Sequence, residues 1–126
     1  MGQSQHSQEL TARAKKQAIS IIAMADALPH KRSADIIARQ IIRSATSVSA
    51  NYRAACRAQS TAEFVSKIHT VQEEADETQH WLELLFESGS ITKETFELLW
   101  KESSELTAIF TASYATARRN RLNKKQ

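Results

Sequence analysis

The sequence predicts an all-α fold, an antiparallel up-down four-helix bundle in one domain that covers residues 1–126. The 126-residue chain has only 2 glycines and 1 proline, too few for the many turns of a mixed or all-β fold. Apolar residues recur at helical spacing through four long segments, and β-branched residues form no sustained alternating run. The sequence therefore predicts helices and no strands.

The first two predicted helices cover about residues 10–28 and 33–59. The first ends before Pro29, whose ring disfavours helical geometry in the preceding residue. Its inner face is predicted to contain Leu10, Ala14, Ala18, Ile21, Ala25 and Leu28. The inner face of the second is rich in small residues, which allow a neighbouring helix to approach closely. It contains Ala34, Ile37, Ile41, Ala45, Val48, Tyr52 and Ala55.

The last two predicted helices cover about residues 60–87 and 92–119. Ser60 and Glu63 form a capping box at the start of the third, and Gly89 suits a left-handed cap after its end. The third helix's inner face is predicted to contain Phe64, Ile68, Val71, Ala75, Leu82 and Phe86. The fourth helix begins at Thr92, and the tail after it is expected to be frayed.

The predicted helices carry more apolar surface than one core can cover. A single core needs an apolar stripe of about 100°, whereas the large apolar residues of the fourth helix spread over about 200° at 100° per residue. Ile19, Leu84 and Trp81 also lie away from the inner faces of their helices. Because large exposed apolar patches usually mark interfaces, we expect a homo-oligomer with Trp81 and Trp100 at the subunit contacts.

Charge is unevenly distributed along the chain. Residues 1–62 hold 9 basic and 3 acidic residues, residues 63–117 hold 3 and 11, and the tail 118–126 holds 5 and none. On the second predicted helix, the side opposite the core carries a basic ridge about 37 Å long. Its members are Arg32, Arg39, Arg43, Arg53 and Arg57.

Three interpretations of this ridge remain open. It is a solvated face, it pairs with the acidic side of the third helix in a neighbouring subunit, or it binds phosphates. The basic tail indicates a polyanion partner, although no aromatic residue is interleaved with its basic residues. The candidate nucleic-acid-binding residues are Arg39, Arg43, Arg53, Arg57, Arg118, Arg119, Arg121, Lys124 and Lys125.

No catalytic or metal-binding constellation is predicted. Glu77 and His80 have the spacing of a di-iron ligand pair, but no second pair of this kind occurs. Cys56 borders the core stripe and is interpreted as a small buried hydrophobic residue. We therefore expect a protein with no enzyme activity, metal or cofactor. A lone cysteine, a polar N-terminus and the lack of a long apolar stretch predict a cytoplasmic protein with no membrane partner.

Residues 40–51 carry a family resemblance, through Arg43, Ser44, Ser47, Val48 and Asn51. This segment resembles the signature of the bacterial four-helix-bundle family named after proteins encoded in intervening sequences of 23S ribosomal RNA genes. Pro29, Glu63-Phe64 and residues 77–85 also fit, and the resemblance covers about residues 28–120. The chain departs from the pattern at Arg53-Ala54-Ala55, where members often carry Ala-Glu-Gly shortly after the asparagine.

The resemblance implies an up-down bundle, commonly a ring of five subunits, with no established enzyme activity and a suspected affinity for RNA or DNA. A bundle similar in architecture, the accessory variability protein of diversity-generating retroelements, is a basic pentameric ring that binds its reverse transcriptase and nucleic acid. We expect Arg43, Ser44, Ser47 and Asn51 to hydrogen-bond between subunits. The first hypothesis is a homo-oligomeric scaffold, a homopentamer, that associates with RNA or DNA. The alternative is a protein-protein interaction hub in which the arginine ridge makes subunit contacts and no nucleic acid binds.

Overall fold

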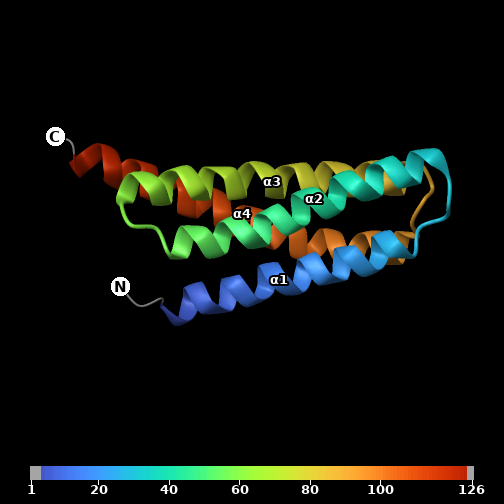
Figure 1. The fold of residues 1–126 in the computed structure, drawn as a ribbon, viewed down its shortest axis with the longest axis horizontal. Coiled ribbons are helices and arrows are strands. Elements are labelled where there is room, and N and C mark those ends of the chain that lie inside the picture. Colours follow the sequence, from blue (N-terminus) through green and yellow to red (C-terminus); the bar gives the residue numbers. More distant parts are fainter. Residues whose placement is uncertain (1–3, 125–126) are drawn as a thin grey trace.

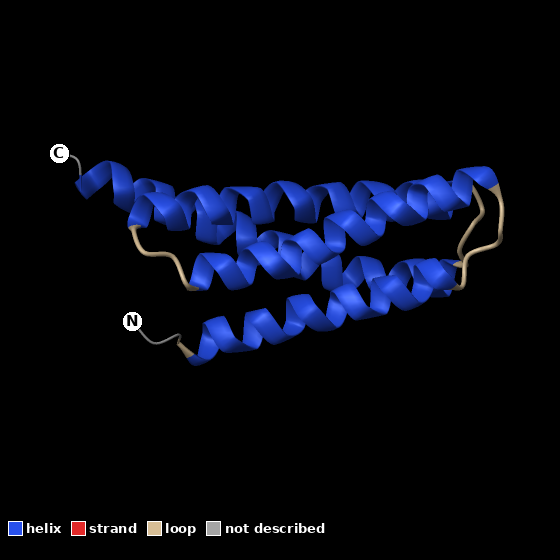
Figure 2. Ribbon diagram, in the orientation of Figure 1, coloured by secondary structure: helices blue, strands red, loops and turns tan. Residues whose placement is uncertain are grey.

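Four helices make up the structure, a computed structural model that describes residues 4–124. They are α1 (Gln5–Asp26), α2 (Arg32–Cys56), α3 (Thr61–Glu87) and α4 (Lys93–Lys124), and no strand occurs among the described residues (Figure 2). The predicted all-α class with four helices is confirmed. Among residues 4–124, no helix combines the length and apolarity that crossing a bilayer requires.

The helices pack side by side along one long axis (Figure 1). Each helix contacts the next in the chain, and α1 also contacts α4, so α1 and α3 lie diagonally opposite, as do α2 and α4. The α1–α2 and α3–α4 connections lie at one end of the molecule, and the α2–α3 connection lies at the other. The C-terminal ends of α2 and α4 therefore lie at the same end.

Local capping explains where α1 and α3 begin. Ser4 accepts a hydrogen bond from the Ser7 amide at 3.1 Å, so α1 begins at Gln5, five residues before the predicted start. Half of the predicted capping box at Ser60 is present: the Ser60 hydroxyl accepts a hydrogen bond from the Glu63 amide at 3.0 Å. The Glu63 carboxylate, however, accepts from the Gln59 amide at 3.1 Å.

The helix ends differ from the predictions at three places, the first of which is α1, which ends at Asp26 rather than near residue 28. α2 ends at Cys56 rather than near residue 59, and α4 continues to Lys124, through the segment predicted to be frayed. Gly89 has φ +79°, the left-handed conformation expected of the residue after α3. The amides of Gly89 and Ser90 donate to carbonyls of the last turn of α3, at 3.0 and 2.8 Å.

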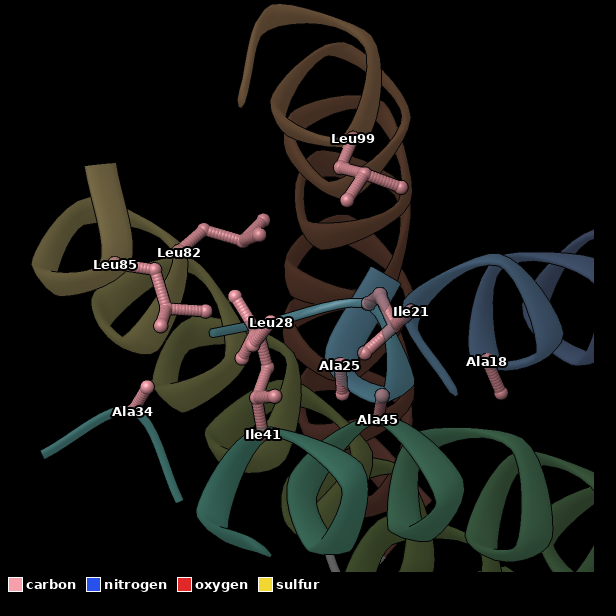
Figure 3. Packing of buried hydrophobic residues seen from close by; sticks show 10 residues of the cluster. All are labelled: Ala18, Ile21, Ala25, Leu28, Ala34, Ile41, Ala45, Leu82, Leu85 and Leu99. Carbon is pink, nitrogen blue, oxygen red and sulfur yellow. The ribbon is translucent and has the colours of Figure 1, made fainter. Parts of the chain in front are cut away.

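The interior consists of two apolar clusters with a polar layer between them. One cluster brings together residues of all four helices, such as Ile21, Ile41, Leu82 and Leu99 (Figure 3), and the other is built around Ile68, Val71, Leu106 and Phe110. Each helix also buries one polar residue, and these are Gln17, Ser44, Thr78 and Ser103. A pocket of about 20 Å³ is lined by Gln17, Thr78 and Ser103 and by apolar residues of both clusters. The polar layer therefore lies between the two clusters.

The predicted inner faces are largely confirmed. All six residues predicted for the inner face of the first helix are buried, including Leu28, which follows the end of α1. Six of the seven predicted for α2 are buried, and Ile37 is half-buried. On α3 the predicted faces err at both ends, because Val65 and Leu85 are buried where Phe64 and Phe86 were expected. The buried positions 68, 71, 75, 78, 82 and 85 of α3 alternate steps of three and four residues, the heptad spacing of helices that pack at small crossing angles.

Candidate nucleic-acid interface

Arg43 is held within the chain by two carboxylates of α3. Its guanidinium lies 2.6 Å from the Glu77 carboxylate and 3.1 Å from that of Glu74. Trp81 donates its indole N–H to the same Glu77 oxygen at 3.2 Å. The hydrogen bond to Glu77 raises the pKa of Arg43, and the same bond lowers the pKa of Glu77. Two carboxylates balance one guanidinium here, so the site has no excess positive charge to offer a phosphate.

The other polar residues of the resembling segment also find partners inside the chain. Ser44 is fully buried, and its hydroxyl accepts a hydrogen bond from Thr78 at 2.8 Å. The half-buried Asn51 donates its side-chain amide to the hydroxyl and the carbonyl oxygen of Ser47, at 2.9 and 3.0 Å. These contacts link α2 to α3 or stay within α2. We expected these side chains to find hydrogen-bond partners in a second subunit. In the structure, residues of the same chain supply those partners.

The two tryptophans predicted at the subunit contacts are half-buried. Trp100 stacks on Phe96 with ring centroids 5.3 Å apart, and Phe96 stacks on Phe86 at 4.5 Å. This aromatic row uses part of the wide apolar stripe of α4 inside the chain. Large apolar side chains nevertheless remain exposed on every helix, and Leu98 of α4 is 75% exposed. The exposed set is Ile19, Ile36, Leu84, Leu98 and Leu122.

The other four arginines of the predicted ridge are all exposed, namely Arg32, Arg39, Arg53 and Arg57. Among residues 4–124, no carboxylate pairs with Arg39, Arg53 or Arg57. Arg53 and Arg57 lie at the C-terminal end of α2, whereas Arg39 lies about 21 Å earlier along the helix at 1.5 Å per residue. The structure therefore divides the predicted ridge: its C-terminal part lies at the same end of the molecule as the end of α4.

The last turns of α4 carry the other predicted basic residues. Arg118 and Arg119 are exposed, Arg121 is half-buried, and none of the three pairs with a carboxylate of the described chain. Lys124 is the last residue of the helix, and Lys125 lies outside the described residues. An open groove follows α4 here, lined by Gln72, Thr111, Tyr114, Ala115, Arg118, Arg119, Leu122 and Asn123. Gln72 belongs to α3, so the groove extends over two helices.

An aromatic pair that the sequence did not reveal has one of its two rings, that of Tyr114, at this groove. The imidazole of His69 on α3 stacks on the Tyr114 ring of α4, with ring centroids 4.7 Å apart and an interplanar angle of 22°. The His69 side chain is 50% exposed, and Tyr114 lines the groove beside Arg118 and Arg119. No local pattern could show this pair, because its members come from separate helices. The aromatic rings thus lie beside unpaired guanidinium groups. Aromatic rings and basic groups are the two features of protein surfaces that bind nucleic acid.

The residues considered for catalysis or metal binding have other contacts. Glu77 is paired with Arg43, and His80 lies against Trp81 with ring centroids 5.0 Å apart. Among the described residues, no group of three or more His, Cys, Asp or Glu side chains is placed to hold a metal ion. Cys56 is half-buried, and burial raises the pKa of the neighbouring Tyr52 phenol to about 12.

Comparison with known proteins identifies the bundle. The model of the family described as 23S rRNA-intervening sequence protein matches residues 6–112. A solved structure, of a protein with unknown function from the S23 ribosomal protein family of Bacteroides thetaiotaomicron VPI-5482, is similar at 32% identity and a TM-score of 0.78. The match covers 83% of this chain and 97% of that one. No curated protein matches the chain. The groove-lining residues Tyr114, Arg118 and Arg119 lie beyond the residues that the family model matches.

Proposed function

The chain belongs to the family of 23S rRNA-intervening sequence proteins, and from this membership we propose that it is a non-enzymatic, homo-oligomeric scaffold that binds RNA or DNA. The binding surface is the basic end of the molecule. It consists of Arg118, Arg119 and Arg121 at the end of α4, with Arg53 and Arg57 at the end of α2. Arg43 is left out, because Glu74 and Glu77 already balance its charge.

One observation carries the proposal: the guanidinium groups at the groove are unpaired although the chain holds 14 acidic residues. Arg13 and Arg43 show that arginines of this chain pair where a carboxylate is within reach, at 2.6 Å in both cases. The arginines near the end of α4 instead present their donors to solvent, a geometry that suits phosphate oxygens. Such contacts release counterions and give affinity that falls steeply with salt.

Self-assembly is the second part of the proposal. Successive connections lie at alternate ends of the molecule, which supports an antiparallel up-down arrangement of the helices. The family resemblance implies a ring of five such subunits. The exposed Ile19, Ile36 and Leu98 supply apolar surface for the contacts. We expect Leu98→Glu to lower the assembly mass in sedimentation velocity, whereas Lys101→Glu, an exposed position one turn along α4, leaves it unchanged. Equal masses for wild type and Leu98→Glu would remove Leu98 from the interface.

The same apolar surface favours a second candidate function, a protein-protein interaction hub that binds no nucleic acid. On this alternative, the exposed arginines of α2 make subunit contacts with the acidic side of α3 in a neighbour. The two functions differ in one measurement. Reversing the charge of Arg53 and Arg57 dissociates the assembly of a hub, whereas in a nucleic-acid scaffold it weakens binding and leaves the mass unchanged.

Fluorescence anisotropy of labelled structured RNA and duplex DNA, titrated at low and physiological salt, tests nucleic-acid binding directly. The test variant replaces Arg118, Arg119 and Arg121 with Gln, which removes charge and keeps a good helix former. The control replaces Lys15, Lys16 and Lys31 with Gln, an equal change of net charge on exposed residues of other segments. We expect the test variant to lower the slope of log K against log salt by about 2 to 3. No binding by wild type at low salt, or an equal effect of the control, would overturn the proposal.

A further inference from the structure

We propose that the α4 groove takes an unpaired nucleobase, so that the protein prefers single-stranded nucleic acid to a duplex. This inference rests on the proposed nucleic-acid function and specifies its substrate. The features that carry it are the stacked pair of His69 and Tyr114, the two arginines beside it and the amide side chains of the same groove.

The aromatic pair is held in place by the bundle. Tyr114 packs partly against the cluster that contains Leu106 and Phe110, and its ring stacks on His69 of the neighbouring helix. His69 is in turn within 3.7 Å of the Glu73 carboxylate, one turn along α3. A ring that is ordered before binding costs less entropy when a base stacks on it. The half-exposed imidazole and the groove-lining phenol thus offer a pre-formed π surface.

A positive charge and an aromatic ring lie one helical turn apart on α4. Arg118 follows Tyr114 by four residues, so both lie on the same side of the helix, about 6 Å apart along its axis. Successive phosphates of an extended single strand are separated by a similar distance, which lets one nucleotide stack while its backbone contacts the guanidinium. Bases on aromatic rings with a basic path beside them are the general device for binding single strands.

The groove also holds unused polar groups. The side-chain amides of Gln72 and Asn123 line it, and neither has a hydrogen-bond partner among residues 4–124. An amide offers a donor and an acceptor, which can pair with the edge of a base that is free of its complement. In a duplex the base faces are covered by their neighbours and only phosphates reach the arginines. Stacking and amide contacts therefore favour the unpaired strand alone.

The test uses three labelled probes of equal length with the full chain: a single strand, the same strand in a duplex, and a single strand with abasic sites. Oligouridine and oligodeoxythymidine versions distinguish RNA from DNA. We expect wild type to bind the single strand about tenfold more tightly than the abasic strand or the duplex. Equal affinity for the abasic and the base-bearing strand would overturn the inference without any variant.

Variants then locate the effect. Tyr114→Leu keeps an apolar side chain against the core and removes the ring, whereas Tyr114→Phe keeps the ring. We expect Tyr114→Leu to lose about tenfold in affinity for the single strand and nothing for the duplex, with Tyr114→Phe close to wild type. If all probes bind equally and Tyr114→Leu has no effect, phosphate binding survives and base stacking is wrong. If no probe binds at low salt, the proposed function itself fails.

Discussion

The buried hydroxyl pair of Thr78 and Ser44 predicts an asymmetric response to mutation. Thr78 Oγ1 lies 2.8 Å from Ser44 Oγ and 2.8 Å from the Glu74 carbonyl oxygen, and its single hydroxyl hydrogen is shared between these two acceptors. Ser44 has one further contact, a longer hydrogen bond of 3.3 Å to the Ile41 carbonyl oxygen. Removing the Thr78 hydroxyl therefore leaves Ser44 with one weak partner, while removing the Ser44 hydroxyl leaves Thr78 with a short one.

The magnitudes follow from this difference. Thr78→Val preserves shape but strands a fully buried hydroxyl, so we expect a loss of about 1.5 kcal/mol in the free energy of unfolding. Ser44→Ala removes an acceptor whose donor keeps the Glu74 carbonyl, so the expected loss is about 0.5 kcal/mol. The double variant removes the stranded group as well and should lose no more than about 1 kcal/mol. The larger single effect corresponds to a fall of about 5 °C in Tm for a domain of this size.

Urea unfolding followed by circular dichroism at one fixed protein concentration measures these differences, since the stability of an assembling protein depends on concentration. Additive effects of the two single variants, or a Ser44→Ala variant less stable than Thr78→Val, would refute the reasoning. Sedimentation of the same variants gives a second check. A change of assembly mass in Ser44→Ala without a change in stability would return Ser44 to a subunit interface.

Three further predictions use the same unfolding assay. Gly89→Ala should cost about 1 kcal/mol, because Gly89 has φ +79° and an added Cβ meets nothing within 4 Å, so the loss is entirely in the backbone; Gly89→Asn should cost less. Ser60→Ala removes the cap of α3 and should cost about 1 kcal/mol, while Ser66→Ala, exposed within the same helix, serves as its control. Arg43→Gln should cost about 0.5–1 kcal/mol at pH 7. Since Arg43 lowers the pKa of Glu77 from its usual 4.5, that difference should be present above pH 4.5 and vanish as the pH falls through the lowered value; an unchanged difference at pH 2.5 would contradict the assignment.

The sequence predicted the helices well because their boundaries are local. Pro29, Ser60 and Gly89 act on their own neighbours, and the faces of α1 and α2 follow from spacing alone. The start of α1 was missed because its first five residues are polar, so the apolar pattern begins after the Ser4 cap. α4 continues past its predicted end to Lys124. Earlier in the same helix, Tyr114 stacks on His69 of α3, a contact that no local pattern contains.

The interior was harder to predict than the boundaries. On α3, the predicted inner face contained Phe64 and Phe86, but the heptad geometry of the packed helices buries Val65 and Leu85 instead. Thr78 and Ser103 were assigned to no inner face because their side chains are polar, yet both are buried. Both side chains hydrogen-bond to residues of other helices, Thr78 to Ser44 at 2.8 Å and Ser103 to Gln17 at 2.9 Å, and these bonds favour their burial. Contacts of this kind depend on the tertiary structure.

The candidate site also depends on tertiary structure that the sequence could not predict. The exposure of the tail arginines could be predicted from composition. The groove, however, exists only because α4 continues beyond residue 112, the last residue of the family match. This extension is about 18 Å long at 1.5 Å per residue. Within that extension Tyr114 contacts α3, whereas Arg118, Arg119 and Leu122 point to the groove and leave the bundle interior untouched. The matched residues thus account for the fold, and the extension supplies the proposed chemistry. Changes to the groove arginines should therefore alter binding at nearly constant stability, while changes to the polar layer should alter stability at nearly constant binding.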